Sequence, residues 1–346
     1  MPSKKQVAER LDNLDAILRV IRAEKKITRK ALMEKLSLSW GCISELAGLL
    51  IANGYVVEEK ASASSIKGRS PSVLTLSESK KVLGIDVNKL GATYCVCDLY
   101  GTKHFEKSNP LRTASKSEML SDIFTTVAEA RATFPDICAV GFAMQGIRDK
   151  KTGIWDFPGE KEIALDFKRD IAAGLDLPAT VRHDPECMLL GCIENTENES
   201  KMLLRIDSGI GATVYQNRDF FTGGLLELGY TVVTHNGERL HHICDTRKLE
   251  KIHNREDYQS ACVRIGMHLG IALGNFCNML LLNEIFICGE IVQYMNDIYP
   301  ILEKSYLDTV IGKARAKITV TGINNAALGA ARLALESLPD TFRRDA

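Results

Sequence analysis

Two neighbouring stretches near the N-terminus carry side chains that could contact nucleic acid. Arg29 and Lys30 open a short amphipathic segment, where their positive charges could hold phosphate oxygens. The next amphipathic segment opens with small, polar or aromatic residues, which could reach base edges. They are Ser39, Trp40, Gly41 and Ser44. This pattern predicts a DNA-binding surface, and the alternative is a three-helix module that contacts only other proteins.

The elements that would position these residues have the order of a winged helix-turn-helix. A first amphipathic helix is predicted from apolar residues at steps of three and four. They are Val7, Leu11, Leu14, Leu18 and Ile21. Thr28 and Ser39 are predicted N-caps of the next two helices, and Asn53-Gly54 ends the third. Alternation at 55–57 and at 72–76 then predicts a two-stranded wing.

A basic segment lies between the two strands of the predicted wing. Lys67, Gly68 and Arg69 precede Ser70-Pro71, so the segment is expected to be extended. An Arg in such a segment suits a narrow A·T-rich minor groove. The alternative is a solvated turn that leads into the linker.

The charge distribution fits a basic head on an acidic body. The 346 residues have no net charge, but residues 1–81 hold 15 Lys and Arg against nine Asp and Glu. The remainder carries the opposite surplus. A basic module joined to an acidic one is the electrostatic footprint of a DNA-binding domain.

Composition and length exclude several classes of protein. The chain is 45% hydrophobic and 25% charged, which is typical of a folded domain rather than a disordered one. No apolar run reaches the ~18–20 residues that span a bilayer, and the start of the chain is not a signal peptide. Its ten cysteines contain no CxxC pair. We therefore expect reduced thiols and a cytoplasmic protein without a membrane partner.

From Lys81 onward the pattern changes to alternating strands and helices. Buried strands are predicted at 82–87 and 137–144, and a glycine turn follows another strand at Ser208-Gly209-Ile210-Gly211. Such a turn can bring backbone N–H groups close to a phosphate. Two α/β halves of similar make-up indicate two lobes with a cleft between them.

These features together resemble the repressor–ORF–kinase (ROK) family, on its branch with an N-terminal winged helix. The resemblance covers nearly the whole chain in the right order and rests on several short motifs. They are Gly84-Ile85-Asp86, Asp98 to Gly101, His183-Asp184, Ser208 to Ala212, Gly223-Gly224-x-x-Glu227-x-Gly229, Ala327 to Ala331, and Gly68-Arg69-x-Pro71 in the head.

The resemblance implies an α/β fold with a winged helix-turn-helix domain at residues 1–75 and an actin-like, hexokinase-type ROK domain at 76–346. Within the latter it implies one lobe at about 81–187 plus 324–346 and a second at about 188–323. It also implies a cleft that binds a sugar or sugar derivative. Genes of carbohydrate metabolism would then be the targets of regulation.

The family's kinase motifs are altered in this sequence. The first phosphate turn of the family follows its Asp with Gly-Gly-Thr, whereas here Asp86 is followed by Val-Asn-Lys-Leu before Gly91. The family's Gly-Gly pair near the adenosine is Gly289-Glu290. Asp184 holds the position of the catalytic base, but a base without a phosphate donor is inactive. We therefore expect no enzyme activity.

The family's sugar-contact positions still carry polar side chains. By resemblance they are His183, Asp184, Glu227, Tyr230 and Glu250. Carboxylates suit this role because they accept hydrogen bonds from sugar hydroxyls. His183 stands where the family has Asn, and Tyr230 stands where it has His.

The family's structural zinc site is predicted to be lost. Tyr230 replaces its His, Leu240 and His242 stand at its first two cysteines, and Arg247 or Lys248 lies near the third. Zinc needs four N or S ligands in a tetrahedron. A regrouped site would draw on residues whose spacing matches no common pattern, namely His235, His241, His242 and Cys244. We expect no metal and no other cofactor.

The resulting hypothesis is a sugar-responsive repressor of double-stranded operator DNA, acting as a homodimer or homotetramer. Ligand in the cleft would shift operator affinity, in the family usually toward release. Two alternatives remain. One is an active ROK sugar kinase that has kept its head, and the other is a ligand-independent DNA-binding protein with a vestigial cleft.

Overall fold

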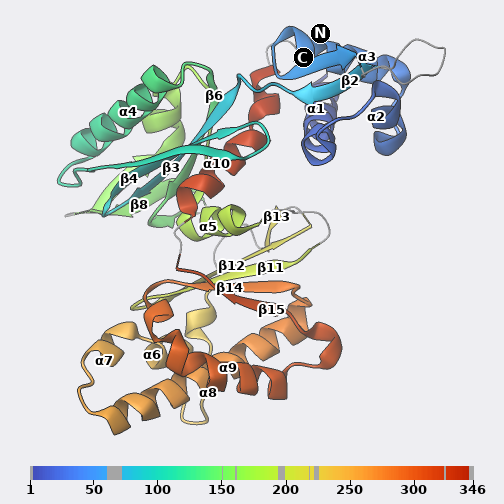
Figure 1. Cartoon of the computed structure of the whole chain (residues 1–346). Coiled ribbons are helices and arrows are strands. Elements are labelled where there is room, and N and C mark those ends of the chain that lie inside the picture. Colours follow the sequence, from blue (N-terminus) through green and yellow to red (C-terminus); the bar gives the residue numbers. More distant parts are fainter. Residues whose placement is uncertain are drawn as a thin grey trace. The chain divides into compact units, whose positions relative to one another are not determined.

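The computed structural model describes residues 3–60, 72–149, 151–159, 162–193, 199–217, 219–221, 226–322 and 325–342. The chain divides into two compact units, whose helices and strands are labelled in Figure 1. Unit 1 comprises Met1–Arg182 together with Ala330–Ala346. Unit 2 comprises His183–Gly329.

Unit 1 begins with three helices, α1 (Lys4–Glu24), α2 (Arg29–Leu36) and α3 (Trp40–Ala52). The predicted caps form, because the Thr28 hydroxyl accepts from the Ala31 amide and the Ser39 hydroxyl accepts from the Cys42 amide. Ser37 adopts the left-handed conformation, with φ of 54°, and α2 and α3 meet at 120°. This angle is that of a helix-turn-helix.

A two-stranded wing follows the helices. Strand β1 (Val56–Lys60) pairs antiparallel with β2 (Ser72–Leu76), and Ile27 pairs with Leu74 at the start of α2. The apolar residues of α1 that predicted its inner face are buried from Leu11 to Ile21. The predicted winged helix-turn-helix order is therefore confirmed.

The body of unit 1 is built on a five-stranded sheet of order β10-β6-β3-β4-β5. Its strands are β3 (Lys81–Asn88), β4 (Gly91–Asp98), β5 (Lys103–Asn109), β6 (Ile137–Met144) and β10 (Ala179–His183). Strands β3, β4 and β5 form antiparallel hairpins, while β6 runs parallel to β3. Strands β3 and β6 are almost wholly buried, as their unbroken apolar runs predict.

Smaller elements complete the body of unit 1. They are α4 (Lys116–Thr133), the three-stranded sheet of β7 (Ile147–Arg148), β8 (Ile154–Pro158) and β9 (Glu162–Asp166), and the short helices η1 (Phe167–Ile171) and η2 (Ala172–Gly174). Figure 1 shows α4 along one side of the sheet and α10 (Ala326–Glu336) along another. A short helix, η7 (Leu338–Phe342), follows α10 and packs against α1.

Unit 2 repeats the strand pattern of unit 1. Its sheet has the order β13-β12-β11-β14-β15. Its strands are β11 (Lys201–Ile206), β12 (Ile210–Gln216), β13 (Asp219–Phe220), β14 (Glu284–Cys288) and β15 (Lys317–Val320). Strands β11, β12 and β13 form antiparallel hairpins, as in unit 1. Strand β11 also runs parallel to β14, which follows in the chain after a helical connection.

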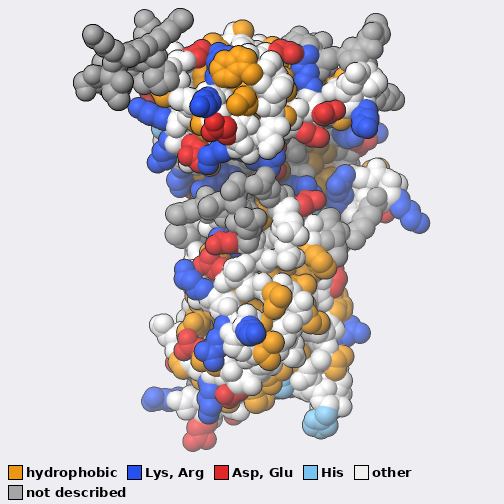
Figure 2. Space-filling model, turned by 90° about the vertical axis from the view of Figure 1, so that its right-hand side faces the viewer, with side chains coloured by type: hydrophobic (Ala, Val, Ile, Leu, Met, Phe, Trp, Pro, Cys, Tyr) orange, Lys and Arg blue, Asp and Glu red, His pale blue; other side chains and the backbone are white. Residues whose placement is uncertain are grey.

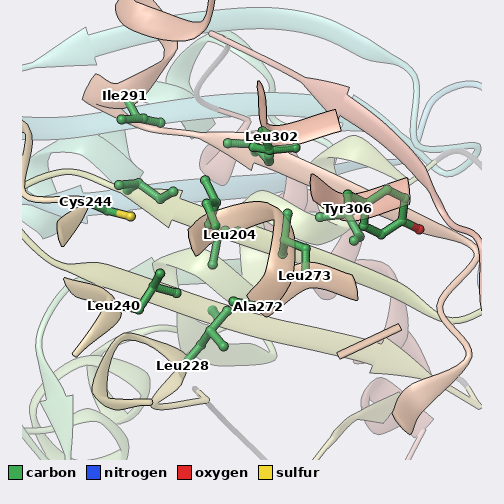
Figure 3. Close-up of a cluster of buried hydrophobic side chains, with 14 of the residues drawn as sticks. Leu204, Leu228, Leu240, Cys244, Ala272, Leu273, Ile291, Leu302 and Tyr306 are labelled. Carbon is green, nitrogen blue, oxygen red and sulfur yellow. The ribbon is translucent and has the colours of Figure 1, made fainter. Parts of the chain in front are cut away.

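The helices of unit 2 enclose its hydrophobic core. They are α5 (Asp184–Cys192), η4 (Leu228–Tyr230), α6 (Leu240–Ile243), α7 (Thr246–Glu250), α8 (Arg255–Leu280), η5 (Glu290–Tyr294), α9 (Met295–Thr309) and η6 (Gly312–Ala314). Helices α8 and α9 pack on one another, and α5 packs on β11 and β12. Figure 3 shows Leu204 of the sheet among Leu273 of α8 and Leu302 of α9.

The mixed α/β fold with its winged head agrees with the fold class that the sequence predicts. Within the described part of the chain, no single helix is both long and apolar enough to cross a membrane. The bent pair of α2 and α3 passes that test by length and composition only.

Candidate functional site

The N-terminal end of α3 presents the residues that the sequence singled out for DNA contact. Ser39, Trp40 and Gly41 are exposed, and Ser44 is half-buried. Trp40 is 54% exposed, although a large indole normally gains from burial. An exposed indole at the start of a recognition helix can contact bases or sugar–phosphate without disturbing the fold.

Arg29 is engaged inside the head. Its Nε and Nη2 donate to the two carboxylate oxygens of Glu58 at 3.1 and 2.8 Å, and its Nη1 donates to the Ser44 carbonyl at 3.2 Å. These bonds hold the pKa of Glu58 below its ordinary value. Arg29 thus ties α2 to α3 and to the wing. Lys30 is exposed, with its Nζ 3.9 Å from Glu34, and keeps its charge available to a phosphate.

Three of the residues predicted to contact DNA lie outside the described part of the chain. They are Lys67, Gly68 and Arg69. The Gly223-Gly224 pair of the body also falls outside it.

Asp184 stands at the first turn of α5, with its side chain directed into a polar network of unit 2. The helix begins with His183 as N-cap, whose amide donates to the Glu186 carboxylate at 2.9 Å, and Pro185 follows at its start. Asp184 is buried, with 9% of its surface exposed. A carboxylate at a helix N-terminus is stabilised by the helix dipole, so the fold favours a charged acceptor here.

Arg205, which the sequence analysis overlooked, holds this carboxylate. Its Nη1 donates to Asp184 Oδ2 at 3.0 Å, and its Nε donates to Asp207 Oδ2 at 2.7 Å. Burial lowers the pKa of Arg205, but Asp207 and Asp184 more than offset burial and raise that pKa above its ordinary value. One sequence signal could have found it: Arg and Asp two positions apart, on the same face, in an otherwise apolar strand.

The second carboxylate oxygen of Asp207 fills a position suited to an anion. Asp207 Oδ1 accepts from the Glu290 backbone N–H at 2.8 Å, directly after Gly289 with φ of 95°. Thr246 donates its amide to the Asp207 carbonyl at 3.2 Å and its hydroxyl to the Glu290 carboxylate at 2.7 Å. Asp207, from the turn between β11 and β12, therefore pairs with the Gly289-Glu290 turn that follows β14.

The turn between β3 and β4 in unit 1 is also satisfied internally. The Leu90 amide donates to Asn88 Oδ1 at 2.8 Å, and the Lys89 amide donates to Gln145 Oε1 at 3.0 Å. The Asn88 amide group in turn donates to Asp86 at 2.9 Å. Two backbone N–H groups that could face a phosphate are thus paired with side-chain oxygens.

Glu227 and Glu250 lie on segments that neighbour the elements of the Asp184 network. Leu226, next to Glu227, pairs with Ala212 of β12, and a Cβ on the neighbouring Gly211 would lie 3.9 Å from Pro185. Glu250 ends α7, the helix whose Thr246 bonds to Asp207 and Glu290. Both carboxylates are exposed. Tyr294 lies near this end of α7, since burial, Glu250 and Glu290 together raise its pKa.

The loop around Tyr230 is held by aromatic contacts. The Tyr230 ring lies 4.9 Å from the ring of His241 and 5.2 Å from the guanidinium of Arg239, and His241 stacks against His242 at 4.0 Å. His241 Nδ1 lies 2.7 Å from the Gly229 carbonyl oxygen, within hydrogen-bond distance. Tyr230 is 58% exposed, so its hydroxyl can meet a ligand.

This loop does not fit the zinc ion that the family resemblance implies. Leu240 and Cys244 are fully buried among apolar side chains (Figure 3). Burial raises the pKa of Cys244 to about 12, so it stays a thiol and a poor ligand. Within the described ranges, no three His, Cys, Asp or Glu side chains are grouped as a metal site.

Solved structures of similar fold were found for both parts of the molecule. A ROK family transcriptional regulator, described as a homolog of the E. coli MLC protein, superimposes with a TM-score of 0.78 at 16% identity, covering 97% of this chain and 99% of the other. A ROK hexokinase from Thermus thermophilus has a TM-score of 0.61 at 17% identity, covering 73% of this chain and 98% of its own. A Streptomyces griseus ROK glucokinase, solved with glucose and AMPPNP, has a TM-score of 0.56 at 16% identity over 73% and 99%.

Curated relatives were also found. The DNA-binding transcriptional dual regulator NagC of Escherichia coli K12 is 22% identical over 242 residues, 66% of this chain and 59% of NagC. The xylose repressor of Caldicellulosiruptor bescii is 25% identical over 233 residues, 63% of this chain and 57% of the repressor. The matched region therefore spans less than two thirds of either relative.

The fold and these matches define an α/β protein of the hexokinase type with a winged helix-turn-helix head. Residues 82–247 match the ROK family. The chain contains a ROK family domain.

Proposed function

We propose that this protein is a sugar-responsive, DNA-binding transcriptional repressor whose ROK domain binds a sugar without phosphorylating it. One observation carries the proposal. A single chain joins a winged helix-turn-helix head to a ROK body in which the β3–β4 turn and the Gly289-Glu290 turn are paired with its own side chains. The named functions of NagC and of the xylose repressor support the same reading. Such a regulator would act in the cytoplasm, where operator DNA lies.

The turns support the absence of kinase activity. A phosphate cradle needs free backbone N–H groups and close approach of the chain. Here Asn88 and Gln145 accept hydrogen bonds from two such groups in the β3–β4 turn, and Asp207 accepts from the Glu290 amide at the Gly289-Glu290 turn. Arg205 Nη1 donates to Asp184 Oδ2 at 3.0 Å, so this oxygen is already engaged in an ion pair. Both effects favour binding over catalysis.

The exposed residues of α3 and an exposed cation on α2, Lys30, support operator binding by the head. Trp40, Ser39 and Gly41 would meet base edges, and Lys30 would hold the phosphate backbone. Arg29 would shape this surface indirectly by fixing α3 against the wing. Two heads on a pseudo-palindromic site would require a dimer or tetramer.

Exposed hydrophobic side chains on unit 2 support self-association. Figure 2 shows such side chains distributed over the displayed face of the lower part of the molecule. Helix α8 exposes Val263 and Met267, and Met279, Leu281 and Ile311 are exposed near the ends of α8 and α9. Apolar surface of this kind commonly marks an interface.

The sugar would bind around Asp184, Glu227 and Glu250, with His183 and Tyr230 at the positions that the family resemblance assigns to ligand contact. Charged acceptors fixed by a helix N-terminus and by Arg205 need no reorganisation to receive hydroxyl hydrogens. Zinc would play no part, because ring stacking around Tyr230 holds the loop. Elemental analysis of the purified protein should give far less than one zinc per chain.

Three assays on the full chain test the proposal. Duplexes selected from a random pool should bind the protein, and Trp40→Ala should weaken that binding about tenfold or more. Ile147→Ala, at an exposed hydrophobic residue in the body of unit 1, is the control and should leave duplex binding unchanged. A panel of sugars should contain one that raises the melting temperature, and Asp184→Asn should abolish that rise.

The third assay separates the regulator from the kinase. A coupled assay with ATP and the same sugars should show no turnover above background. Turnover that disappears in Asp184→Asn would make the protein an active ROK kinase with a retained head. Operator binding with no response to any sugar would instead favour the ligand-independent reading.

A further inference from the structure

Glu45 lies on the outer face of α3, the helix labelled in the head in Figure 1. At 3.6 residues per turn, it falls opposite the buried residues of the helix. They are Ile43, Leu46, Ala47 and Leu50. The Glu45 side chain is 63% exposed, and the sequence of α3 contains no other charged residue. The outer face of the helix therefore presents a single carboxylate.

Glycines flank Glu45 on this outer face. Gly41 precedes it by four positions and Gly48 follows it by three, so both are its neighbours on the helix surface. Among the described residues, nothing lies within 4 Å of a Cβ added to Gly48, and a Cβ on Gly41 would meet only the Ser39 hydroxyl oxygen, at 4.0 Å. Glycine weakens a helix interior relative to alanine, and packing does not require it at Gly48. The bare backbone allows a groove of DNA to approach α3 closely.

Arg10 of α1 positions the carboxylate of Glu45 and balances its charge. Its Nη2 lies 3.2 Å from Glu45 Oε1, and its side chain is 31% exposed. A carboxylate beside DNA is repelled by the phosphates unless a cation lies next to it. Arg10 supplies this cation from α1, which packs against α3. The head can therefore present Glu45 to a base at a smaller electrostatic cost.

A carboxylate in the major groove discriminates between bases, because its oxygens only accept hydrogen bonds. Cytosine presents its N4 amino group in that groove and no acceptor of its own. Adenine presents the N6 amino group beside the acceptor N7, while guanine and thymine present acceptors. Those acceptors repel a carboxylate oxygen. The chemistry of Glu45 therefore matches cytosine better than any other base.

We propose that Glu45 sets the base preference of the head by accepting a hydrogen bond from the N4 amino group of a cytosine in the major groove. The inference rests on the proposed function, and it names the base that operator DNA carries opposite α3. In a symmetric operator each half-site holds one such C·G pair. Arg10 is a positioning residue, since it acts on the base only through Glu45.

Selection of duplexes from a random pool by the full chain tests this proposal. The selected sites should carry a C·G pair at one fixed position of each half-site, and replacing that pair should weaken binding about tenfold. Glu45→Gln substitutes an amide of the same shape, which pairs with N6 and N7 of adenine. The selected pair should then change to A·T at that position and nowhere else. Glu45→Ala should select no particular base there.

Glu34→Gln is the matched control, because it removes the same charge from a side chain of similar exposure. Glu34 lies on α2, is 60% exposed and lies 3.9 Å from Lys30 Nζ. Each substitution leaves a cation, Arg10 or Lys30, without its acidic neighbour. Both variants should therefore bind unselected duplex more tightly and with a steeper salt dependence. Only Glu45→Gln should change the selected base pair.

A further variant tests the close approach of α3 to the groove. Gly48→Leu has room for its side chain, so its melting temperature should stay near that of the unmodified protein. It should bind the selected duplex about tenfold more weakly, because the leucine would lie between the helix and the groove. Ala128→Leu adds similar bulk at an exposed position of α4 in the body and should leave binding unchanged. Unchanged binding by Gly48→Leu would place the groove away from this face and overturn the proposal.

The selection experiment separates this proposal from the proposed function. A change from C·G to A·T in Glu45→Gln, absent in Glu34→Gln, supports the role of Glu45. Selected sites without a fixed C·G pair, or sites that stay the same in Glu45→Gln and Glu45→Ala, overturn that role and leave the proposed function standing. A chain that selects no duplex refutes the proposed function and this inference with it.

Discussion

The two units of this protein each pair the backbone N–H groups of a turn with side-chain oxygens, and they do so by different chemistry. In unit 1 the turn after β3 is paired with neutral amide oxygens, those of Asn88 and Gln145. In unit 2 the Glu290 N–H, in the turn after β14, is paired with Asp207, a carboxylate balanced by Arg205. Both central strands pair antiparallel with the next strand and parallel with a later one.

The difference shows that a backbone geometry able to hold phosphate can be closed in two ways. A neutral amide oxygen accepts a hydrogen bond from an N–H group and leaves the local charge unchanged. A carboxylate also accepts from a backbone N–H group, but its negative charge must be balanced by a neighbouring cation. Unit 2 therefore depends on an ion network that unit 1 does not need, and substitutions should affect the two units unequally.

The largest loss of unfolding free energy is expected where α10 packs on β6 in the sheet of unit 1. Gly141→Ala places a Cβ 1.9 Å from the Ala330 carbonyl oxygen, a contact that only backbone movement can relieve. We expect a loss of about 4 kcal/mol of unfolding free energy, measured by chemical denaturation. Gly48→Ala, where the added Cβ meets nothing, should change stability by less than about 1 kcal/mol. Equal losses of unfolding free energy for Gly141→Ala and Gly48→Ala would show that α10 is not closely packed on β6.

A smaller loss is expected from the ion network of unit 2. Arg205→Met leaves Asp184 and Asp207 without their shared guanidinium, which is itself 36% exposed. Allowing for solvent screening, we expect a loss of about 2 kcal/mol at neutral pH, measured by the same denaturation. Arg247→Met, which removes a more exposed guanidinium (62%) paired with Asp245, is the control and should cost less. A neutral Arg205→Met would mean that the network contributes no stability.

Unit 1 contains the inverse arrangement, one carboxylate held by two cations. Asp170 is 10% exposed, contacts Lys116 and accepts from Arg169 Nε at 2.9 Å. Burial raises its pKa, but the bonds from Arg169 and Lys116 outweigh burial and hold the pKa below its ordinary value. A depressed folded-state pKa gives stability that is present above about pH 4 and lost as the pH falls toward the folded value.

Asp170→Asn should therefore destabilise the protein by about 1 kcal/mol at pH 7, and the difference from the unmodified chain should shrink below about pH 4. Denaturation curves between pH 7 and pH 3 measure it. A difference that stays constant over this range would assign the loss to packing rather than to charge. Asp176→Asn, at a more exposed pair with Arg131, should change stability less.

The smallest expected change in melting temperature comes from removing the side chains that pair with the turn N–H groups, Asp207 in unit 2 and Asn88 in unit 1. Asp207→Gly frees the Glu290 N–H beside Arg205, so millimolar inorganic phosphate should raise the melting temperature slightly, by about 1 °C. Asn88→Gly frees the Leu90 N–H without adding a cation, so phosphate should leave its melting temperature unchanged. Equal changes in melting temperature with phosphate for both variants would show that the charge of the side chain that pairs with the N–H group does not matter.

Much of the head could be read from local patterns. The three helices begin at Ser3, Thr28 and Ser39, whose side chains cap the helix that follows, and the wing strands alternate as expected. Short-range hydrogen bonds and periodicity decide these features, and both lie within a few residues of sequence. The role of Arg29 could not be read this way, because its partner Glu58 lies 29 positions away.

The residues of the candidate site also divide into those that local sequence predicts and those that depend on distant partners. Asp184 and the glycine turn were identified from motifs, each within a handful of residues. Gln145 was missed because it acts through Lys89 on another turn. The contact of Arg205 with Asp184 on α5 was missed as well, although its spacing to Asp207 was a local signal. The contact between Gln145 and Lys89 spans 56 positions. Nothing in either local segment marks the two as neighbours.

By itself, the sequence determined the order of elements, the ROK resemblance and the altered kinase motifs, since each depends on residue type and short spacing. Only the tertiary structure decided how the backbone N–H groups of the turns are paired, that Arg29 joins α2 to the wing, and that η7 packs against α1. Those features depend on distances between segments far apart in the chain. Such distances are set by packing two sheets and their helices to the density of a protein interior, which no local pattern encodes.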